Sequence, residues 1–375
     1  MFNSRYLFIL FLLFFLSFII FPFPLSPYEK PKILTAEIVI QMLVIITIYK
    51  GLKKFTKKLD KHFLIVSSII LLISVLHLLF LRSLTAFWGN AIRLQGIFLL
   101  WHLIVFSLVS SGFKFDKIPK FFPLMSTIAI LIFALVLNRD LNNRAVGTLG
   151  EPNSLAAMAI FIWPFLYTLK FSRKMREIFA KTSALLFVII IILLSNSRSG
   201  FVALSIQLIF LANITLFKMS YVKASIISIF FLGTSLILPF LAKATALENR
   251  AEIWQIAVKA GFDKPIFGYG FGNLETAISD FSQSFNYNNV RYQYVDSSHN
   301  FILDWWLQAG VIGLLVIFYL TLKSVSNFAL FKENRNLLAF LGVITVLSFN
   351  PASVVSLIHF WWLIGQGFAR HQRSD

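Results

Sequence analysis

Apolar residues along this chain gather into long blocks separated by short polar gaps. Runs of about 20 apolar residues recur, which at ~1.5 Å per residue is long enough for a helix to cross the hydrocarbon core of a bilayer. We predict about twelve transmembrane helices, several of them short, near residues 5–24, 33–49, 63–81, 91–111, 121–137, 154–170, 182–196, 200–217, 224–242, 299–321, 337–350 and 353–369. The seventh and eighth are the hardest to divide, because only Ser195 to Gly200 separates them.

Composition supports lipid as the solvent for most of this surface. The 375 residues are 58% hydrophobic and only 13% charged, whereas a soluble domain carries roughly 25% charged residues. The run from Tyr6 to Phe21 after Arg5 is similar to a signal peptide, but it lacks a small-residue cleavage site and prolines follow it. We therefore expect an all-α polytopic membrane protein whose first span is retained.

The positive charge of the chain, +18 at pH 7, indicates orientation rather than nucleic-acid binding. With a cytoplasmic N-terminus, 22 of the 34 lysines and arginines fall in the predicted inside segments, as the positive-inside rule requires. No basic stripe with stacking aromatics stands in a soluble segment. We predict that both termini are cytoplasmic. The absence of cysteine excludes disulfides, thiolate metal sites and cysteine nucleophiles.

Two connections on the outer face are long, and long loops are where function concentrates. Residues 243–298 form a polar excursion between the ninth and tenth predicted helices, and a smaller loop covers 138–153. The chain thus divides into helices one to nine over 1–242, the long loop with short helices over 243–298, and helices ten to twelve with a tail over 299–375. Within the long loop we predict one short helix over 248–261.

His299 is the most informative single residue. It stands where the long loop meets the tenth predicted helix, in Asp296-Ser297-Ser298-His299-Asn300. Histidine titrates near ~6.5, so it can take up and return a proton at working pH. A lone histidine at a membrane boundary is also typical of an interfacial residue with a solvated ring. The residues around it favour a catalytic base.

His299-Asn300 is followed by nine residues and then by Gly310-Val311-Ile312-Gly313, which makes the pattern H-N-x9-G-x-x-G. This segment resembles the family of O-antigen ligases and O-antigen polymerases, bacterial lipid-linked glycan transferases that carry the pattern where a large periplasmic loop enters the next helix. Close packing of helices would also explain two small residues at this spacing.

Three further segments resemble the same family. Arg250 and Trp254 fit its R-x-x-x-W element, and Pro265 to Gly270 fits P-x-x-G-x-G. Ser195 to Gly200 fits its S-x-S-R-x-G turn, which contains Arg198. A looser patch contains Arg144, Gly147 and Asn153. The resemblance extends from about residue 138 to 320, and the first 120 residues match only as hydrophobic helices.

The resemblance implies an inverting transfer without metal or cofactor, on the periplasmic face of the bacterial inner membrane. A glycan would pass from undecaprenyl diphosphate to an acceptor hydroxyl, and we expect lipid A–core as the acceptor. Such a reaction needs positive charge on the diphosphate and a base for the hydroxyl. The resemblance assigns the base to His299 and the diphosphate contacts to Arg198, Arg250 and Arg144, with possible support from Asn300, Asp304, Trp254 and Arg291. A protonated His299 could instead donate a hydrogen bond to the diphosphate, and the sequence does not separate these two roles.

Simpler interpretations stay open for these residues. Arg198 could snorkel to the interface, Arg250 could pair with Glu248 or Glu252, and Arg144 could be solvated. Asp304 could complement its helix N-terminus or orient His299. Trp254, with Tyr269 and Phe271, could line a sugar path or pack the loop, and Glu151 and Asp140 are expected to be solvated. We read His77, His102 and His359 as helix–helix hydrogen-bonding residues.

Two alternative functions also stay open. An O-antigen polymerase, which joins lipid-linked repeat units, shares the motifs, and transfer to a protein is a related outcome. A lipid or solute transporter belongs to a different class and would predict inverted repeats and broken helices, neither of which the sequence reveals.

Overall fold

The computed structural model describes residues 4–24, 26–51, 55–56, 59–113, 115, 118–137, 139–140, 142–237, 240, 245–282 and 295–369. Among these residues the chain is helical, and its one extended pairing is an isolated bridge between Arg139 and Ala145. The helices are α1 (Ser4–Phe14), α2 (Glu29–Tyr49), α4 (Lys61–Leu81), α5 (Leu84–Trp88), α6 (Ile97–Ser111), α7 (Phe121–Val136), α8 (Pro152–Tyr167), α9 (Lys174–Ser195), α10 (Arg198–Thr215), α11 (Tyr221–Ser235), α13 (Thr245–Asp263), α14 (Leu274–Ser282), α15 (Phe301–Leu330), α16 (Asn334–Leu347) and α17 (Val354–Gly367), with short 3-10 turns at Leu16–Phe18 and Gly147–Leu149.

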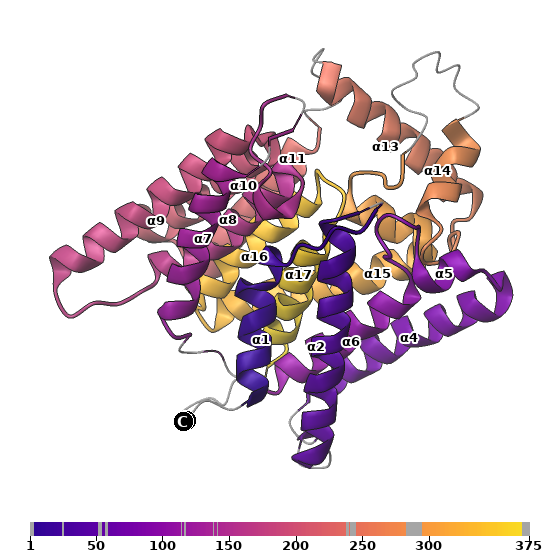
Figure 1. The fold of residues 1–375 in the computed structure, drawn as a ribbon, viewed down its shortest axis with the longest axis horizontal. Coiled ribbons are helices and arrows are strands. Elements are labelled where there is room, and N and C mark those ends of the chain that lie inside the picture. The colour runs from indigo at the N-terminus through magenta and orange to yellow at the C-terminus, as the bar shows by residue number, and fades with distance from the viewer. Residues whose placement is uncertain are drawn as a thin grey trace.

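Three helices form the centre of the protein. Almost every residue of α8, α16 and α17 is buried, and Figure 1 shows α16 and α17 in the middle of the helices. Helix α6 packs on α17, while α10 packs on α16 and α9 on α8. Since these helices are apolar all round, they can be stable only when other helices cover every face.

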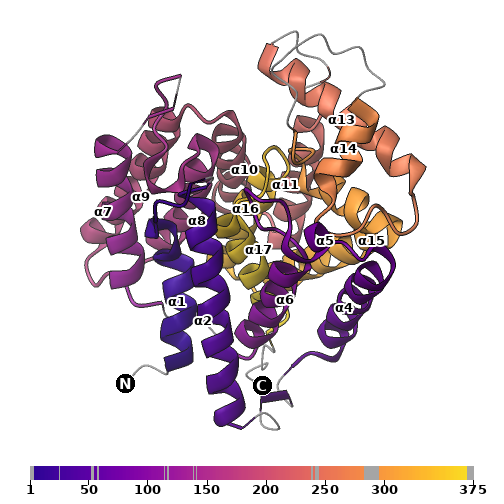
Figure 2. The ribbon, with the colours of Figure 1, turned by 45° about the vertical axis from the view of Figure 1, so that its right-hand side comes forward.

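The outer helices expose large apolar side chains on the faces turned away from this centre. Examples are Ile65 and Leu72 of α4, Phe179 and Leu186 of α9, and Phe230 of α11. Figure 2 places α4 on one flank and α7 and α9 on the other. Such a surface fits lipid, not water. Five of the described helices, α2, α4, α9, α10 and α15, are long and apolar enough to cross a membrane, so the chain is a multi-pass helical membrane protein.

Each predicted apolar segment contains a helix of the structure. The uncertain pair around Ser195 is confirmed as two helices, α9 and α10, which meet at residues 196–197. The predicted helix in the long loop is confirmed as α13, although it begins earlier and continues through Gly261 to Asp263. The number of twelve spans and the topology remain predictions, because seven of the apolar helices are only 10–17 residues long.

The first predicted span, 5–24, is longer than the helix it contains. Helix α1 ends at Phe14 after 11 residues, a rise of about 17 Å against the ~30 Å of a hydrocarbon core. A 3-10 turn follows, and after it the backbone is extended at Ile19. Prolines at 22, 24 and 27 lack the N–H that a continuing helix would donate.

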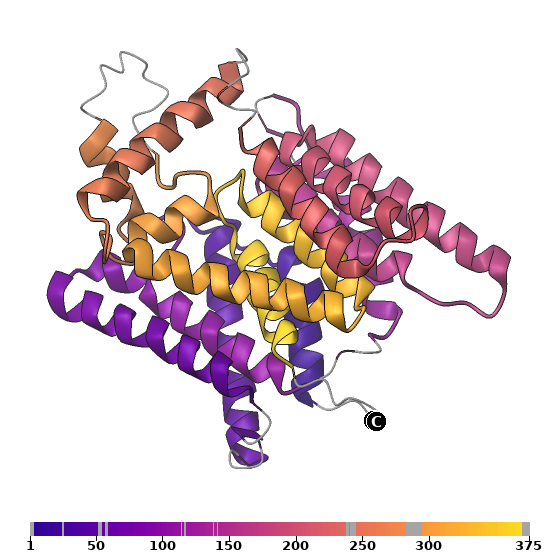
Figure 3. The same ribbon diagram turned by 180° about the vertical axis from the view of Figure 1, so that it is seen from behind.

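Helix α15 is broken, which the sequence did not indicate. Ala309 and Gly310 have non-helical backbone angles, and Gly310 adopts φ +60° and ψ −159°. The longer part of the helix runs across the back of the protein over α17 (Figure 3). The expectation that broken helices are absent, used above against a transporter, is therefore wrong.

The break is closed by the segment Pro265–Gly270. The Val311 N–H donates to Pro265 O (2.7 Å), while Leu307 O and Gln308 O accept from the N–H groups of Tyr269 (2.7 Å) and Gly270 (3.0 Å). Three backbone groups at the break are thus bonded to this segment, which suits a membrane environment, where unpaired backbone groups are costly. The segment with the P-x-x-G-x-G motif therefore packs directly against the break at Gly310, the first glycine of the G-x-x-G motif.

Candidate functional site

The segment that precedes α15 is held by one buried carboxylate. Asp304, in the first turn of α15, accepts hydrogen bonds from Ser297 Oγ (2.7 Å), Ser298 N (2.8 Å) and Ser298 Oγ (2.6 Å). No hydrogen bond joins it to the His299 ring among the described residues. Asp304 therefore fixes the backbone that presents His299 and does not contact the imidazole, and its place in the first turn of α15 also fits the predicted complement to the helix N-terminus.

Asn300, the asparagine of the H-N motif, has a structural role at the start of α15. It is the N-cap of α15, and its Oδ1 accepts from the N–H groups of Ile302 (3.0 Å) and Leu303 (3.2 Å). An asparagine satisfies the free donors of a helix start in this way. The residue before it, His299, has φ +57°, a left-handed conformation that is uncommon for residues other than glycine.

The His299 side chain is half-buried, and its ring forms no hydrogen bond with the described residues. Burial, together with the positive charges of Arg250 and Arg93, lowers the pKa of His299 to about 4, while Asp296 acts in the opposite direction. At neutral pH the imidazole is uncharged and can accept a proton.

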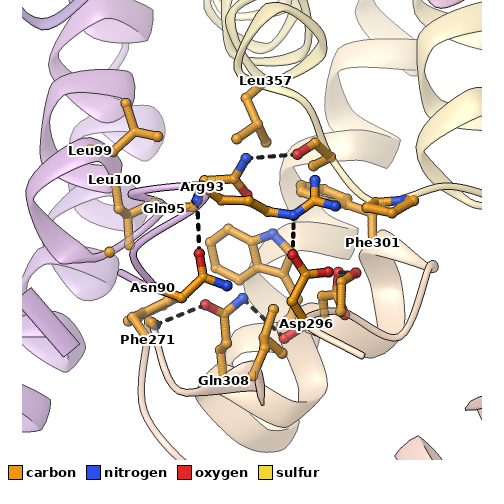
Figure 4. Close-up of a pocket in the computed structure, with 18 of the residues that line it drawn as sticks. Asn90, Arg93, Gln95, Leu99, Leu100, Phe271, Asp296, Phe301, Gln308 and Leu357 are labelled. Atoms are coloured by element: carbon orange, nitrogen blue, oxygen red, sulfur yellow. Dashed lines mark hydrogen bonds and ion pairs between the residues drawn. The ribbon is translucent and has the colours of Figure 1, made fainter. Parts of the chain in front are cut away.

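Arg93 stands on one side of His299. It lies in the connection between α5 and α6 and forms an ion pair with Asp296, three residues before His299 (Figure 4). Burial alone would lower the pKa of Arg93, but the charge and hydrogen bond of Asp296 outweigh burial and raise it. The pair lines a pocket with polar groups such as Asn90 and Gln308 at one end and apolar groups such as Leu99 and Leu357 at the other.

Arg250 stands on another side. Its Nη2 donates to Asn350 Oδ1 (3.3 Å), in the connection between α16 and α17, and Asn350 Nδ2 donates to Ser199 Oγ (2.7 Å). Burial lowers the pKa of Arg250 most, Glu151 opposes this, and the charges of Arg198 and Arg144 add to the lowering. Among the described side chains, Arg250 forms no ion pair with Glu252, so the predicted pairing of Arg250 with Glu252 is wrong. The side chain of Glu248, the other predicted partner, lies outside the described side chains.

Arg198 and Arg144 complete the group, in different ways. Arg198 is the first residue of α10, after the N-cap Ser197, and its side chain is exposed. Arg144 is paired with Asp140 (Nη2 to Oδ2, 2.6 Å). Arg144 and Asp140 are therefore not freely solvated loop residues. Although burial alone would raise the pKa of Asp140, the hydrogen bonds and charge of Arg144 lower it.

Glu151 is not solvated either. Its two carboxylate oxygens accept from Asn153 Nδ2 (3.3 Å) and Ser154 Oγ (2.9 Å). Asn153 Oδ1 in turn accepts from Ser197 Oγ (2.8 Å), the cap of α10. The smaller outer loop is thereby tied to the turn that carries Arg198.

The aromatic residues of the long loop pack it. Trp254 is buried between Phe240 and Phe349, at centroid distances of 5.8 and 6.2 Å. Tyr269 is buried and donates to Asp263 Oδ2 (2.9 Å), whereas Phe271 lines the pocket beside Arg93. The remaining predicted residue, Arg291, lies outside the described residues.

Two of the other histidines, His102 and His359, join helices as predicted, whereas His77 contacts the turn between α13 and α14. The Nε2 atoms of His77 and His359 lie 3.0 Å from Phe267 O and Leu13 O, and that of His102 lies 3.0 Å from Gln41 Nε2.

Sequence reasoning missed Arg93 and Asn350. Arg93 fell near the start of the predicted span 91–111, but α6 begins only at Ile97, so Arg93 lies in an irregular connection. An ionisable residue inside an apolar run is by itself a functional signal, and Arg93 in the predicted span 91–111 was such a residue. Asn350 was marked only by the Asn-Pro step between two apolar runs.

Known proteins are similar in sequence to part of this chain. Residues 183–318 match the family model described as O-Antigen ligase. A protein of Rickettsia conorii provisionally named as a polysaccharide ligase is 24% identical over 233 residues, which is 56% of this chain and 53% of that protein. The ComP-specific O-oligosaccharyltransferase of Acinetobacter baylyi is 24% identical over 221 residues, 54% of this chain and 39% of that protein. A Rickettsia felis protein, also provisionally named as a polysaccharide ligase, is 27% identical over 192 residues, 46% of each chain.

This chain therefore matches about half the length of the curated relatives or less. The family match includes His299, Asn300, Arg198 and Arg250, whereas Arg93, Arg144 and Asn350 lie outside it. The region 183–318, which contains the H-N-x9-G-x-x-G motif, is thus similar in sequence to the O-antigen ligase family.

Proposed function

We propose that this protein transfers a glycan from a lipid diphosphate, undecaprenyl diphosphate, to an acceptor hydroxyl on the periplasmic face of the bacterial inner membrane. The observation that carries the proposal is that His299 lies within the fields of Arg250 and Arg93, while Arg198 and Arg144 act on Arg250. A neutral base and a cluster of positive charges are the two requirements of such a transfer.

In the proposed reaction, the acceptor oxygen forms a bond to the anomeric carbon of the glycan. The bond from that carbon to the diphosphate oxygen breaks, and the lipid diphosphate leaves with the electron pair. The acceptor proton passes to the His299 imidazole. Arg250 and the exposed Arg198 stabilise the charge on the leaving diphosphate, for which the guanidinium fork is suited.

The low pKa of His299 has a consequence for this mechanism. An imidazole with a pKa of about 4 is a weak base in the free protein. A bound diphosphate would neutralise the arginine charges that lower the pKa, so His299 would become a stronger base when donor is present. The base is thus strengthened by the substrate it serves.

The acceptor is proposed as lipid A–core. An O-antigen polymerase would use the same chemistry with a lipid-linked glycan as acceptor, and the name of the Acinetobacter relative refers to a protein, ComP. A transporter is less well supported than transfer, because the backbone groups at the α15 break are bonded to Pro265–Gly270 and are not free for a transported ligand.

The test is a deletion strain of the native host complemented with wild type, His299→Ala or the control His62→Ala, an exposed histidine outside the site. Lipid-linked and surface glycans are extracted and their chain lengths compared. We expect long chains stranded on the lipid carrier, restored to the surface by wild type and His62→Ala only.

Other outcomes have equally direct meanings. Single repeat units at the surface would indicate the polymerase, and loss of glycan from a protein would indicate a protein acceptor. Unchanged glycans of every kind would contradict the transfer proposal.

A further inference from the structure

The connection between α5 and α6 holds Arg93 in a fixed place. Asn90 Oδ1 accepts from the N–H groups of Ile92 (3.3 Å) and Arg93 (2.8 Å), and Gln95 Nε2 donates to Ala352 O (2.7 Å). Figure 4 shows Asn90 and Gln95, with their bonds to Arg93 and Ala352, around the Arg93 side chain. Because the backbone is anchored on both sides, the guanidinium is presented to the site with little freedom of its own.

The partner of this guanidinium belongs to the segment that carries His299. Arg93 and Asp296 are 21% and 11% exposed, so their ion pair is mostly shielded from water and is stronger than a surface pair. It joins two parts of the chain separated by more than 200 residues. The segment 295–300 is therefore held by Asp304 at one end and by Arg93 at the other.

The charged groups near His299 come from several elements. Arg250 of α13, Arg93 of the α5–α6 connection and Asp296 of its own segment act on it directly. Behind them, Glu29 of α2 and Glu151 before α8 act on Arg93, and Asp304 of α15 is bonded to the two serines. Of the three charged groups that act directly on the imidazole, Arg250 and Arg93 are basic and Asp296 is acidic.

We propose that Arg93 is a positioning residue: its guanidinium holds Asp296, which fixes the segment carrying His299 and keeps that carboxylate from pairing with the imidazole. The role in catalysis rests on the proposed function of His299 as base. A free carboxylate three residues away would stabilise the imidazolium, and an imidazolium cannot accept the acceptor proton. Arg93 lies outside the region shared with the family model, so this role comes from the geometry of this chain.

The test begins with a readout that does not need activity. The full chain in detergent or nanodiscs, with isotope-labelled histidine, is titrated by NMR, and the His299 signal is assigned by its loss in His299→Gln. We expect Arg93→Gln to raise the pKa of His299 by about one unit or more, since a positive charge is removed and Asp296 is released. Arg93→Lys, which keeps the charge, and Arg82→Gln, a control at an exposed arginine at the end of α4, should titrate close to wild type.

A double variant separates this role from mere support of the fold. Asp296→Asn in the Arg93→Gln background removes the released carboxylate, so the pKa of His299 should fall again relative to Arg93→Gln alone. Simple damage to the fold predicts no such return. A His299 titration unchanged in Arg93→Gln, or unaffected by the second substitution, would overturn the proposal.

Kinetics then connect the titration to transfer. If Arg93→Gln brings His299 to an ordinary pKa of ~6.5, about nine-tenths of it is protonated at pH 5.5, so kcat/KM should fall about tenfold there and recover by pH 8. A wild-type protein that transfers no glycan, with the NMR shift as expected, would refute the proposed function and leave the pairing role standing. A wild-type protein that transfers glycan, combined with an unchanged His299 pKa in Arg93→Gln, would refute the pairing role and leave the proposed function standing.

Discussion

At the scale of single residues, the segment that carries His299 depends on the buried carboxylate of Asp304. Asp304 is buried in an apolar helix, where an unpaired carboxylate would be costly. It is tolerated because three donors from Ser297 and Ser298 surround it. The same bonds force the preceding segment into the conformation in which His299 adopts a positive φ. The polar residue and the strained histidine are parts of one arrangement.

Substitution of Asp304 should therefore remove both stability and activity. Asp304→Ala leaves the buried donors of Ser297 and Ser298 unpaired and should lower the free energy of unfolding by about 3 kcal/mol. Asp304→Asn keeps one acceptor and should lie between Asp304→Ala and wild type. Thermal unfolding in detergent and glycan transfer measure the two effects, with Glu177→Gln, whose partner Lys181 lies on α9, as control. Full transfer by Asp304→Ala would mean that the segment keeps its shape without this carboxylate.

The pH dependence of transfer tests the environment of His299. Only the neutral imidazole can act as base, and its pKa in the free protein is lowered to about 4. We expect kcat/KM to stay near its neutral value down to about pH 5 and to reach half near the lowered pKa. The measurement is transfer at low donor concentration across pH, with recovery at pH 7 as the control for unfolding. An acid limb near the ordinary ~6.5 would show that His299 is not the base or is solvated.

At the scale of elements, the glycines of the family motif act through a break in a helix. Gly310 adopts a backbone conformation open essentially to glycine alone, and a Cβ there would collide with Ile266 O. The segment Pro265–Gly270 fits into this space and replaces the missing helical hydrogen bonds. The loop that carries α13, and with it Arg250, is thereby joined to α15, the helix that follows His299 and Asn300.

A single methyl group should separate these two elements. Gly310→Ala is expected to destabilise the protein by at least about 3 kcal/mol, from the backbone conformation and the collision together. Gly233→Ala on α11 is the matched control, since a Cβ there meets nothing within 4 Å. Thermal unfolding and limited proteolysis within α13 and α14 are the measurements. Equal protease resistance of both variants would mean that the contact at Gly310 can be relieved at low cost.

At the scale of the whole molecule, the sequence predicted where helices lie better than how they meet. Apolar runs are read from composition, so the pair around Ser195 and the helix of the long loop were found. The meeting of Arg93 with Asp296, or Arg250 with Asn350, joins residues 100 or more apart. Such pairs leave no periodic signal along the chain. Arg144 and Glu151 were likewise named from the sequence, but their pairing with Asp140 and with Asn153 and Ser154 was not predicted.

The arrangement of the helices bears on orientation. Figure 2 shows the beginning of α1 at the end of the molecule opposite to α13 and α14. Lys120 Nζ donates to Lys170 O, and Lys170 and Lys332 line one pocket near the end of α8 that lies opposite to Glu151. Basic residues thus gather at the end away from His299. From the positive-inside rule we therefore predict that this end is cytoplasmic and that the site is periplasmic.

The chain contains no cysteine, which makes this orientation testable with single introduced thiols. Ser279 of α14 and Ser172 between α8 and α9 are both exposed, near opposite ends of the molecule. With a membrane-impermeant thiol reagent on cells whose outer membrane is permeabilised, Ser279→Cys should be labelled and Ser172→Cys protected until lysis. The cysteine-free chain is the blank. The reverse pattern would place His299 and the arginines on the cytoplasmic side, where a glycan transferred to the cell surface could not be accepted, and labelling of both before lysis would mean that the two ends do not lie on opposite sides of the membrane.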